Sequence, residues 1–412
     1  MGLSHLARLG PRYGVVCIVL LVAAAAGAVW LAGPSSGDTP GGPATAASSV
    51  PAAPVSHPFF RAVYGYGGTR LTAAQEGVRY RVMILQAADA AMIPRLKAND
   101  PGLKVLMYVD MMSADPRDAD GHSDWVGYTQ ARVNPGWILR GASGKPLTYK
   151  HSASFVMDVG NAAYQDTGVA RVIGLAQAGG FDGAFLDDAN ASLRWIIPGG
   201  QARSVTYPTT ASWQGAVYSF LTSVAPQLHR AGLLVVANIG GSTITPGLWQ
   251  RWNGPIDGAM EESFTNGGTG RDSAANGQWP AKLAHAVWSE KHGKIALDHA
   301  VTATRAGARY GLATMLLAAD GENLYSASTG YRREVWWPED RAANDLGRPL
   351  GGYRVLRDGV YRRDFQHGVV LVDPHLHAKG PIRLGGTYVG SGLGRVRTVT
   401  LAGRSGVVLL RS

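Results

Sequence analysis

Two short segments of this sequence follow one template and end in carboxylates. Residues 181–188 read FDGAFLDD, and residues 256–263 read IDGAMEES. When their Asp-Gly-Ala steps are aligned, Asp187 lies opposite Glu262. A carboxylate that acts as nucleophile or base, paired with a carboxylic acid that donates a proton, is the arrangement that cleaves a glycosidic bond. The template therefore predicts Asp187 and Glu262 as a catalytic pair; the alternative is two unrelated acidic residues at strand ends.

Side-chain direction within the two segments follows the period of two that a β-strand imposes. On this basis Asp187 and Glu262 face the same way, over the mouth of a barrel. Asp188 and Glu261 face the other way; we expect them to bond neighbouring loops and count both among the candidate substrate-binding residues. A register slip of one residue would exchange these roles, so the choice between Glu261 and Glu262 as the acid stays open.

Further polar residues stand at the ends of other predicted strands, where they are suited to hold sugar hydroxyls. Asp110 and Asn238 are the strongest of them, because each ends a strongly apolar strand. A structural hydrogen bond is the alternative for every one. The full set is Tyr64, Tyr66, Gln86, Asp110, Asn238, Asp298 and Tyr325.

No metal site and no cofactor is predicted. His375 and His377 have the spacing of metal ligands, but they fall in the C-terminal region, away from the predicted mouth. The sequence has no phosphate-binding glycine motif and no G-x-S-x-G nucleophile segment.

The elements that must position these residues alternate between short apolar strands and helical stretches. Such alternation is typical of a parallel sheet, and eight strands close a TIM barrel. We therefore predict the α/β class, with a (β/α)8 TIM barrel over residues 57–340. The predicted strands are residues 62–67, 81–86, 104–110, 182–188, 233–240, 257–263, 294–300 and 323–328, and the predicted helices are residues 88–99, 162–177, 212–230, 280–292 and 304–318.

Two regions depart from the alternating pattern. Residues 111–154 form a long third connection that carries Trp125, Trp137 and Tyr149, either for stacking on sugar rings or for packing the loop onto the barrel. Residues 341–412 contain short β-like runs separated by glycine turns, which predict a small C-terminal antiparallel β-domain.

The N-terminal region has the composition of an export signal. Arg8 and Arg12 precede residues 14–33, an uncharged apolar stretch of about the 20 residues that cross a membrane. We expect residues 1–33 to be a signal peptide or membrane anchor and residues 34–56, rich in Pro, Gly, Ala, Ser and Thr, to be a linker. The predicted location is extracellular or at the cell surface. Cys17 is the only cysteine, so the exported part has no disulfide.

The composition and net charge indicate which classes of binding partner to expect. The chain has 412 residues, 46% of them hydrophobic, and a net charge of +10, which is typical of a globular protein. The positive charge is not gathered into a block of Lys and Arg, so nucleic acid is not an expected partner. It is compatible with an acidic glycan.

Several segments together resemble a known family. GFDGAFLDD, ANIGG, DGAMEES, YGLATMLLAADG and DGVYRRDFQHGVVLVDP are similar to the bacterial hypothetical TIM-barrel glycosyl hydrolases and, more distantly, to the endo-α-1,4-polygalactosaminidase barrels. The resemblance implies Asp187 as nucleophile or base and Glu262 as acid. Together with the N-terminal region, it leads us to expect an exported or membrane-tethered glycoside hydrolase that cleaves a cell-envelope or extracellular polysaccharide. The alternatives are a non-catalytic carbohydrate-binding protein on the same scaffold and, more weakly, a hydrolase of an ester or phosphodiester.

Overall fold

The computed structural model describes residues 58–63, 79–150, 152–265, 277–329, 331 and 336–412. The predicted export segment, the linker, Tyr64 and Tyr66 lie outside these residues. Within the described part of the chain, no helix has the length and apolar character needed to cross a membrane.

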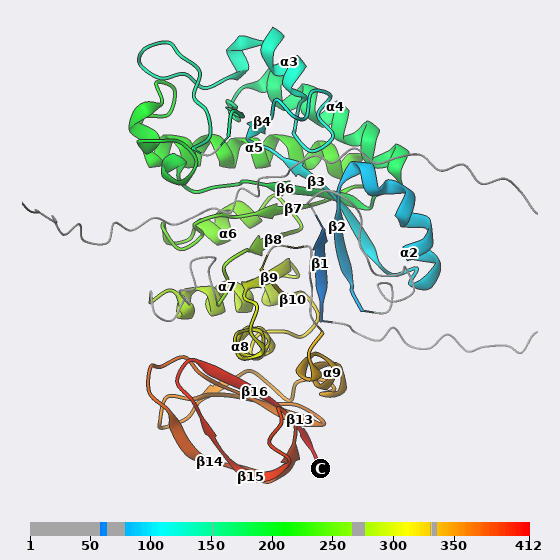
Figure 1. Cartoon of the computed structure of the whole chain (residues 1–412), viewed down its shortest axis with the longest axis vertical. Helices are drawn as coiled ribbons and strands as arrows, with labels where there is room; N and C mark the ends of the chain where they lie inside the picture. Colours follow the sequence, from blue (N-terminus) through cyan, green and yellow to red (C-terminus); the bar gives the residue numbers. More distant parts are fainter. Residues whose placement is uncertain (1–57, 64–78, 151, 266–276, 330, 332–335) are drawn as a thin grey trace, which may run out of the picture.

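Eight parallel strands form one sheet that curls into a barrel (Figure 1). The strands are β1 (Phe60–Val63), β2 (Val82–Leu85), β3 (Lys104–Asp110), β6 (Gly183–Asp187), β7 (Leu234–Asn238), β8 (Gly258–Glu261), β9 (Ile295–Val301) and β10 (Asn323–Ser328), in that order. A parallel bridge between Phe59 and Tyr325 joins the first strand to the last. The predicted (β/α)8 TIM barrel is confirmed.

Helices cover the outside of the barrel. They are η1 (Ala87–Met92), α2 (Ile93–Asn99), α4 (Ala162–Gly179), α5 (Thr210–Arg230), α6 (Leu248–Asn253), α7 (Trp279–Lys291) and α8 (Arg305–Leu316). Local sequence sets their ends: the side chain of Asn161 accepts from the Tyr164 N–H at the start of α4, and Gly180 closes that helix at φ 74°. The first predicted helix is divided into η1 and α2, with Pro94 in the first turn of α2.

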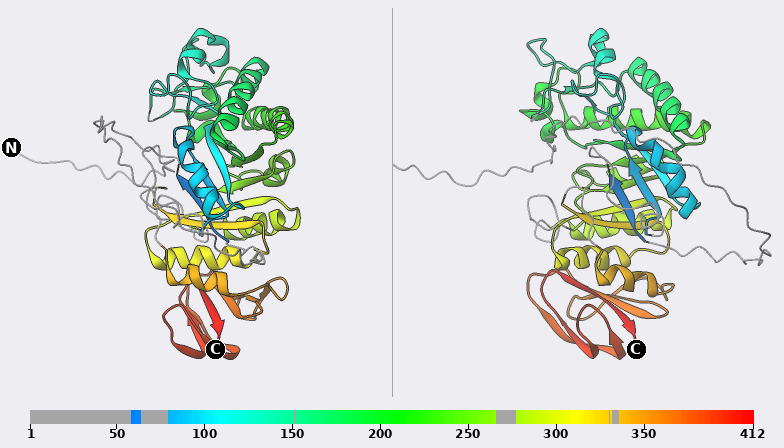
Figure 2. Two further views of the ribbon diagram at one scale, coloured as in Figure 1. Left: turned by 90° about the vertical axis from the view of Figure 1, so that its right-hand side faces the viewer. Right: turned by 45° about the vertical axis from the view of Figure 1, so that its right-hand side comes forward.

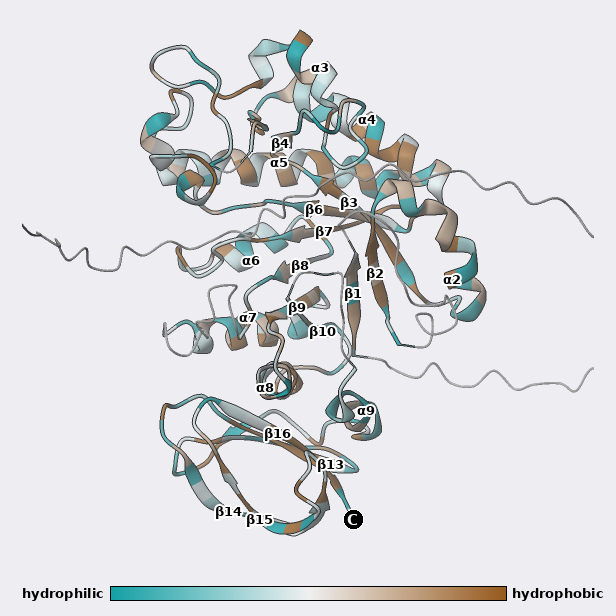
Figure 3. Ribbon diagram, in the orientation of Figure 1, coloured by the Kyte–Doolittle hydropathy of each residue, from teal (hydrophilic) through white to brown (hydrophobic). Residues whose placement is uncertain are grey.

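The core has two layers. The barrel interior is lined with apolar side chains: Phe60, Ala62, Val82, Ile84, Leu106, Phe185, Val236, Met260, Leu297 and Leu324. A larger apolar layer fills the space between the strands and the helices. Figure 3 shows the hydrophobic colour along β2 and β3, as expected for parallel strands that are buried on both faces.

The shared Asp-Gly-Ala template has a structural reason. Asp182 accepts a hydrogen bond from the Val105 N–H at 2.8 Å, and Asp257 accepts one from the Val235 N–H at 2.7 Å. Each aspartate therefore satisfies a backbone donor near the start of the neighbouring strand. A Cβ atom on Gly183 or Gly258 would lie only 2.4 or 2.2 Å from a carbonyl oxygen of the adjacent strand. Both positions thus require glycine.

The long third connection and the C-terminal domain lie at opposite ends of an elongated molecule (Figure 2). The connection contains β4 (Ser113–Ala114), α3 (Tyr128–Val133), η2 (Pro135–Trp137) and β5 (Phe155–Val156). The side chains of Trp125, Trp137 and Tyr149 are buried. Their burial favours the alternative in which they pack the loop onto the barrel. Two further 3-10 turns, η3 (Leu193–Trp195) and η4 (Gly200–Arg203), follow β6.

The C-terminal domain is a six-stranded antiparallel sheet, as predicted. Its strands are β11 (Arg354–Val355), β12 (Tyr361–Asp364), β13 (Gly368–Asp373), β14 (Lys379–Val389), β15 (Arg395–Leu401) and β16 (Ser405–Arg411), arranged β11-β12-β13-β16-β14-β15. The helix α9 (Pro338–Asp345) leads into it. The buried guanidinium of Arg363 donates to the carbonyl oxygens of Leu316 and Ala319 at the end of α8, which fastens this sheet to the barrel.

Candidate active site

One amide group joins the two predicted catalytic carboxylates. Asn238 ends β7, between the strands that carry Asp187 and Glu262. Its side-chain nitrogen donates to Asp187 Oδ1 at 2.8 Å and to Glu262 Oε2 at 3.1 Å. The structure therefore brings Asp187, Asn238 and Glu262 together at the C-terminal end of the barrel, where TIM-barrel enzymes place their active sites.

Three donors hold the carboxylate of Asp187. Besides Asn238, the Tyr108 hydroxyl donates to Oδ2 at 2.8 Å and the Asp188 N–H donates to Oδ1 at 2.8 Å. Tyr108 comes from the neighbouring strand β3, two residues before the strand ends. Bonds to both oxygens fix the plane of the carboxyl group.

The carboxyl group of Glu262 has a different environment. The Tyr331 hydroxyl donates to Oε1 at 2.5 Å. Burial and the nearby charge of Asp187 raise the pKa of Glu262, against the opposing effect of the hydrogen bonds from Tyr331 and Asn238. A raised pKa favours the protonated form that a general acid requires.

Asp188 supports the site from the loop that follows β6. Its backbone is in the left-handed region, at φ 63°, a conformation that non-glycine residues adopt at a cost. The carboxyl group accepts from the Tyr149 hydroxyl at 2.9 Å and from the Asn190 amide at 2.8 Å. Burial, followed by the charges of Asp110 and Asp187, raises its pKa well above the ordinary value.

Asp110 lies at the start of the long third connection. Its Oδ1 atom accepts from the N–H groups of Met112 and Ser113, at 2.9 and 3.0 Å. Burial and then the charge of Asp124 raise the pKa of Asp110 well above its usual range, and burial raises that of Asp124 to about 7. The bonds to the backbone show that Asp110 shapes the loop beside the site.

Glu261 points away from the barrel mouth toward α7. Its carboxylate lies 3.1 Å from the Lys282 ammonium, and both side chains are only 6% exposed. Burial alone would raise the pKa of Glu261, but Lys282, His285 and Ser242 outweigh burial and lower it to about 2. Glu261 is thus an ionised partner in a buried ion pair, which leaves Glu262 as the carboxyl group at the mouth.

The remaining residues predicted from the sequence do not join the carboxylates at the barrel mouth. Asp298 is buried on β9, and burial, followed by the charge of Glu261 on the neighbouring strand β8, raises its pKa well above the ordinary value. The Tyr325 hydroxyl donates to the Ala308 carbonyl of α8 at 2.8 Å. Because Glu261, Asp298 and Tyr325 face the helices, we do not carry them into the proposed site. Gln86 accepts from Ser123 at 2.8 Å, next to the third connection.

Sequence reasoning missed three residues at or beside the site. Tyr108 and His299 each lie two residues beyond an interior apolar side chain, Leu106 and Leu297, so the period of two could have identified them. Tyr331 comes from a loop, and no periodic signal marks it. The missed set is Tyr108, His299 and Tyr331; Tyr149 was named only as a loop aromatic, and its bond to Asp188 was not foreseen.

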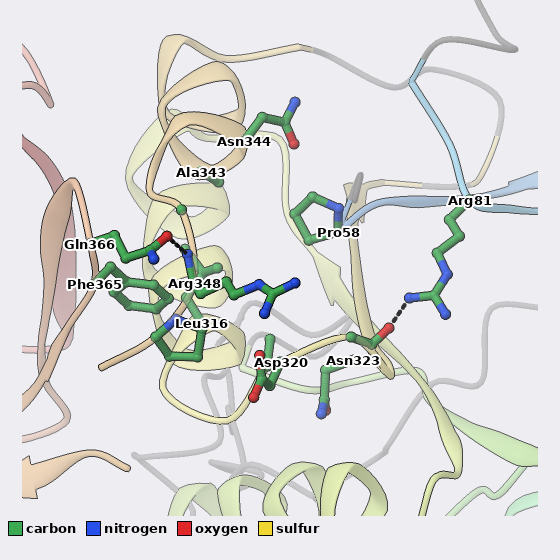
Figure 4. Close-up of a pocket in the computed structure, with 14 residues that line it drawn as sticks. Pro58, Arg81, Leu316, Asp320, Asn323, Ala343, Asn344, Arg348, Phe365 and Gln366 are labelled. Carbon is green, nitrogen blue, oxygen red and sulfur yellow. Dashed lines mark hydrogen bonds between the residues drawn. The ribbon is translucent and has the colours of Figure 1, made fainter. Parts of the chain in front are cut away.

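A polar cavity of about 610 Å³ lies at the opposite end of the barrel (Figure 4). Arg81 and Asn323, near the starts of β2 and β10, line it together with Asn344, Arg348 and Phe365. It is therefore a space between the N-terminal face of the barrel and the C-terminal domain, remote from the carboxylates. No group of three or more His, Cys, Asp or Glu side chains suited to a metal ion occurs among the described residues.

Solved structures of glycosidases are similar to this chain. A maltogenic α-amylase, AmyB from Thermotoga neapolitana, shares 12% identity over 87% of this chain and 98% of its own, with a TM-score of 0.50. Ega3 from Aspergillus fumigatus in complex with galactosamine shares 11% identity over 68% of this chain and 93% of its own, at 0.41. The GH36 α-galactosidase AgaA from Geobacillus stearothermophilus shares 12% identity over 87% and 56%, at 0.48.

The sequence itself carries the family signal. The search of curated proteins gave no match. The family model described as hypothetical glycosyl hydrolase family 15 matches residues 97–369. That span includes Asp110, Asp187, Asn238, Glu262 and Tyr331. The chain therefore belongs to hypothetical glycosyl hydrolase family 15 and is a glycoside hydrolase with a TIM-barrel fold.

Proposed function

We propose that the protein is a retaining glycoside hydrolase in which Asp187 is the nucleophile and Glu262 the acid and base. The observation that supports this is the shared amide of Asn238. Because Asp187 Oδ1 and Glu262 Oε2 lie 2.8 and 3.1 Å from the same nitrogen, the two oxygens are no more than about 5.9 Å apart. Retaining enzymes place their carboxyl groups about 5–5.5 Å apart, and inverting enzymes about 6.5–9.5 Å.

The reaction uses the two environments in turn. Asp187 forms a bond to the anomeric carbon while Glu262 passes its proton to the leaving glycosidic oxygen. Ionised Glu262 then takes a proton from a water molecule, whose oxygen attacks the anomeric carbon and releases Asp187. The bonds from Tyr108 and Asn238 hold Asp187 in place. The raised pKa of Glu262 favours the protonated form, which supplies the proton for the first step.

The charge of the mouth indicates which sugars it accepts. The charge of Asp187 contributes to the raised pKa of Asp110, Asp188 and Glu262, so the four carboxyl groups lie close together. Among the described residues, no Lys or Arg forms an ion pair with any of these four. A uronic acid or sulfated sugar would bring another anion into this field. We therefore propose a neutral or cationic sugar at the cleaved bond, although the chain as a whole is basic.

The proposed location is outside the cell. The charged start and apolar stretch of residues 1–33, followed by the linker at 34–56, support export with possible retention at the membrane. The proposed substrate is accordingly a polysaccharide of the cell envelope or the surroundings. Fractionation of cells that express the full chain tests this: recovery of the protein only in the cytoplasmic fraction would contradict it.

Asp187→Asn and Glu262→Gln test the catalytic assignment. A panel of neutral, amino-sugar and acidic polysaccharides, read out by released oligosaccharides, identifies a substrate for the wild type. Each variant should then lose about 10²–10⁴-fold in kcat, with the thermal unfolding midpoint retained. Asp320→Asn, an exposed carboxylate at the other end of the barrel, is the matched control and should keep full activity.

A covalent intermediate distinguishes the proposed mechanism from its alternatives. An activated 2-fluoro glycoside of the identified sugar should add one sugar to the protein, and peptide mass spectrometry should find it on Asp187. Hydrolysis that releases the inverted anomer would contradict retention. Saturable binding without turnover across the panel would instead indicate a non-catalytic carbohydrate-binding protein.

A further inference from the structure

His299 is a fully buried histidine in the barrel interior, close to the proposed acid. It lies on β9 two residues beyond Leu297, so its side chain points to the same interior face. Its exposed fraction is 0%. Within the part of the chain that the structure describes, neither ring nitrogen has a hydrogen-bond partner. An unpaired polar group of this kind destabilises a core, so the histidine calls for an explanation.

The His299 imidazole contacts two aromatic rings, those of Tyr331 and Phe60. The imidazole stacks on the Tyr331 ring with centroids 4.7 Å apart and an interplanar angle of 27°, and Phe60 packs edge-on at 6.4 Å. Burial lowers the pKa of His299 to about 3, so the ring is neutral at physiological pH. The imidazole therefore acts here as a flat aromatic support.

Tyr331 has a conformation that needs such support. Its backbone is in the left-handed region, at φ 57°, which a bulky residue rarely adopts. Its N–H donates to Ser328 Oγ at 3.1 Å, and its hydroxyl donates to Glu262 Oε1. The Ser328 bond holds the backbone and the His299 ring holds the side chain, so the hydroxyl is aimed at the proposed acid.

We propose that His299 is a positioning residue, which keeps the Tyr331 hydroxyl on Glu262 and thereby sets the protonation of that carboxyl group. The role depends on the flat ring and not on its nitrogens. The inference rests on the proposed function, because it assigns a task to the acid of that mechanism.

Several other groups face Glu262 and must be kept unchanged in a test. The charges of Asp187 and Asp188, at the end of β6, act on Glu262. So does the charge of Glu261, the residue just before it. The side chain of Asn238 on β7 donates a hydrogen bond to Glu262. The donated bond from Tyr331 stabilises the ionised form of Glu262, so its loss raises the pKa. The direction of the expected shift is therefore upward.

The test follows the protonated fraction of Glu262 without any substrate. A diazoacetamide esterifies protonated carboxyl groups, and peptide mass spectrometry of the labelled full-length protein gives the midpoint for Glu262 against pH. Tyr331→Phe should raise the midpoint by about one pH unit, the effect of one hydrogen bond to a charged group. His299→Leu should raise it by at least half as much, because the Tyr331 ring loses the flat ring on which it stacks.

Three further variants separate positioning from a merely structural role. His299→Phe keeps the flat ring and should leave the midpoint unchanged, with a higher thermal unfolding midpoint because two unpaired nitrogens are removed. Leu297→Val, on the same face of β9, should lower stability and leave the Glu262 midpoint unchanged. Ser328→Ala removes the bond to the Tyr331 backbone N–H and should raise the midpoint; it replaces His299→Leu as the test if that variant does not fold.

The outcomes are distinct. A Glu262 midpoint that stays at the wild-type value in His299→Leu and Ser328→Ala overturns the proposal. A midpoint that rises as far in His299→Phe as in His299→Leu also overturns it, because the ring nitrogens would then be responsible. If Glu262→Gln retained hydrolysis, the proposed function would fail while the labelling result still decided the role of His299. In the active enzyme, the upper limb of the pH profile of kcat/KM should move with the midpoint.

Discussion

Replacing Glu261 by glutamine removes one charge from the ion pair between β8 and α7 and leaves the other buried. The carboxylate lies 3.1 Å from the Lys282 ammonium, and Lys282 also donates to the Ser263 carbonyl. Breaking such a pair on one side costs about 3–5 kcal/mol, because the remaining ammonium has lost its counter-charge. We therefore expect Glu261→Gln to destabilise the fold while Glu262, one residue later, is the position that affects chemistry.

The pKa of Glu261 leads to a similar magnitude. Its lowering from 4.5 to about 2 corresponds to about 3 kcal/mol of preference for the ionised form in the folded state. An unfolding entropy of about 2.1 cal/mol/K per residue gives about 0.7 kcal/mol/K for a folded unit of roughly 350 residues, so the unfolding midpoint should fall by about 4 °C.

The sign of the pH dependence is fixed by the direction of the lowered pKa. The stabilising effect of Glu261 is fully present above pH 4.5 and is lost as the pH falls toward about 2. The difference in unfolding midpoint between the wild type and Glu261→Gln should therefore be full at pH 7 and shrink as the pH falls below 4.5. Circular dichroism during heating, with equilibrium guanidinium unfolding at pH 7, measures both.

A matched variant separates burial from the mere loss of a charge. Glu322 lies 4.0 Å from Arg81 with both side chains partly exposed, at 32% and 41%, so Glu322→Gln should cost less than about 0.5 kcal/mol. The reasoning is refuted if Glu261→Gln shifts the midpoint no more than Glu322→Gln does at pH 7. A difference that persists unchanged at pH 2 would refute it as well.

Two further predictions concern single side chains. Tyr108→Phe removes one donor from Asp187 and should lower kcat about tenfold or more, with little change in the thermal midpoint; an unchanged kcat would show that this bond is dispensable. Arg363→Met leaves the carbonyl groups of Leu316 and Ala319 without their donor and should cost about 3 kcal/mol. Calorimetry should then resolve earlier unfolding of the C-terminal domain, and a single unshifted transition would contradict the fastening role of Arg363.

Much of the fold was predictable because buried parallel strands leave a local signal. The bounds of β3 and β10 agree with the predicted strands at both ends, and the other strands differ by one or two residues at most boundaries. The prediction for the first strand began two residues late and continued into residues outside the described range. The short helix α6 was missed, because six residues are too few to show a helical period.

The candidate site was predictable only in part. The template alignment placed Asp187 opposite Glu262, and the period of two gave both the same face, which the shared amide of Asn238 bears out. Asp298 was chosen only as a polar residue at a predicted strand end, and its side chain faces the helices, whereas its neighbour His299 lies on the interior face with Leu297. The sequence shows that polar residues stand near the end of an apolar strand. Which of them points into the barrel is known only once the structure shows that Leu297, on the same strand, faces the interior.

The sequence alone determined the barrel, the C-terminal β-domain and a pair of carboxylates at the ends of two alternate strands, because strand periodicity and the Asp-Gly-Ala template are local properties. Tertiary structure gave Glu261 and Glu262 different environments, since the partners that distinguish them, Lys282 and Tyr331, lie 21 and 69 residues away along the chain. A side chain acquires its charge state from groups that only folding brings near. The environment of each carboxyl group is therefore a property of the assembled barrel.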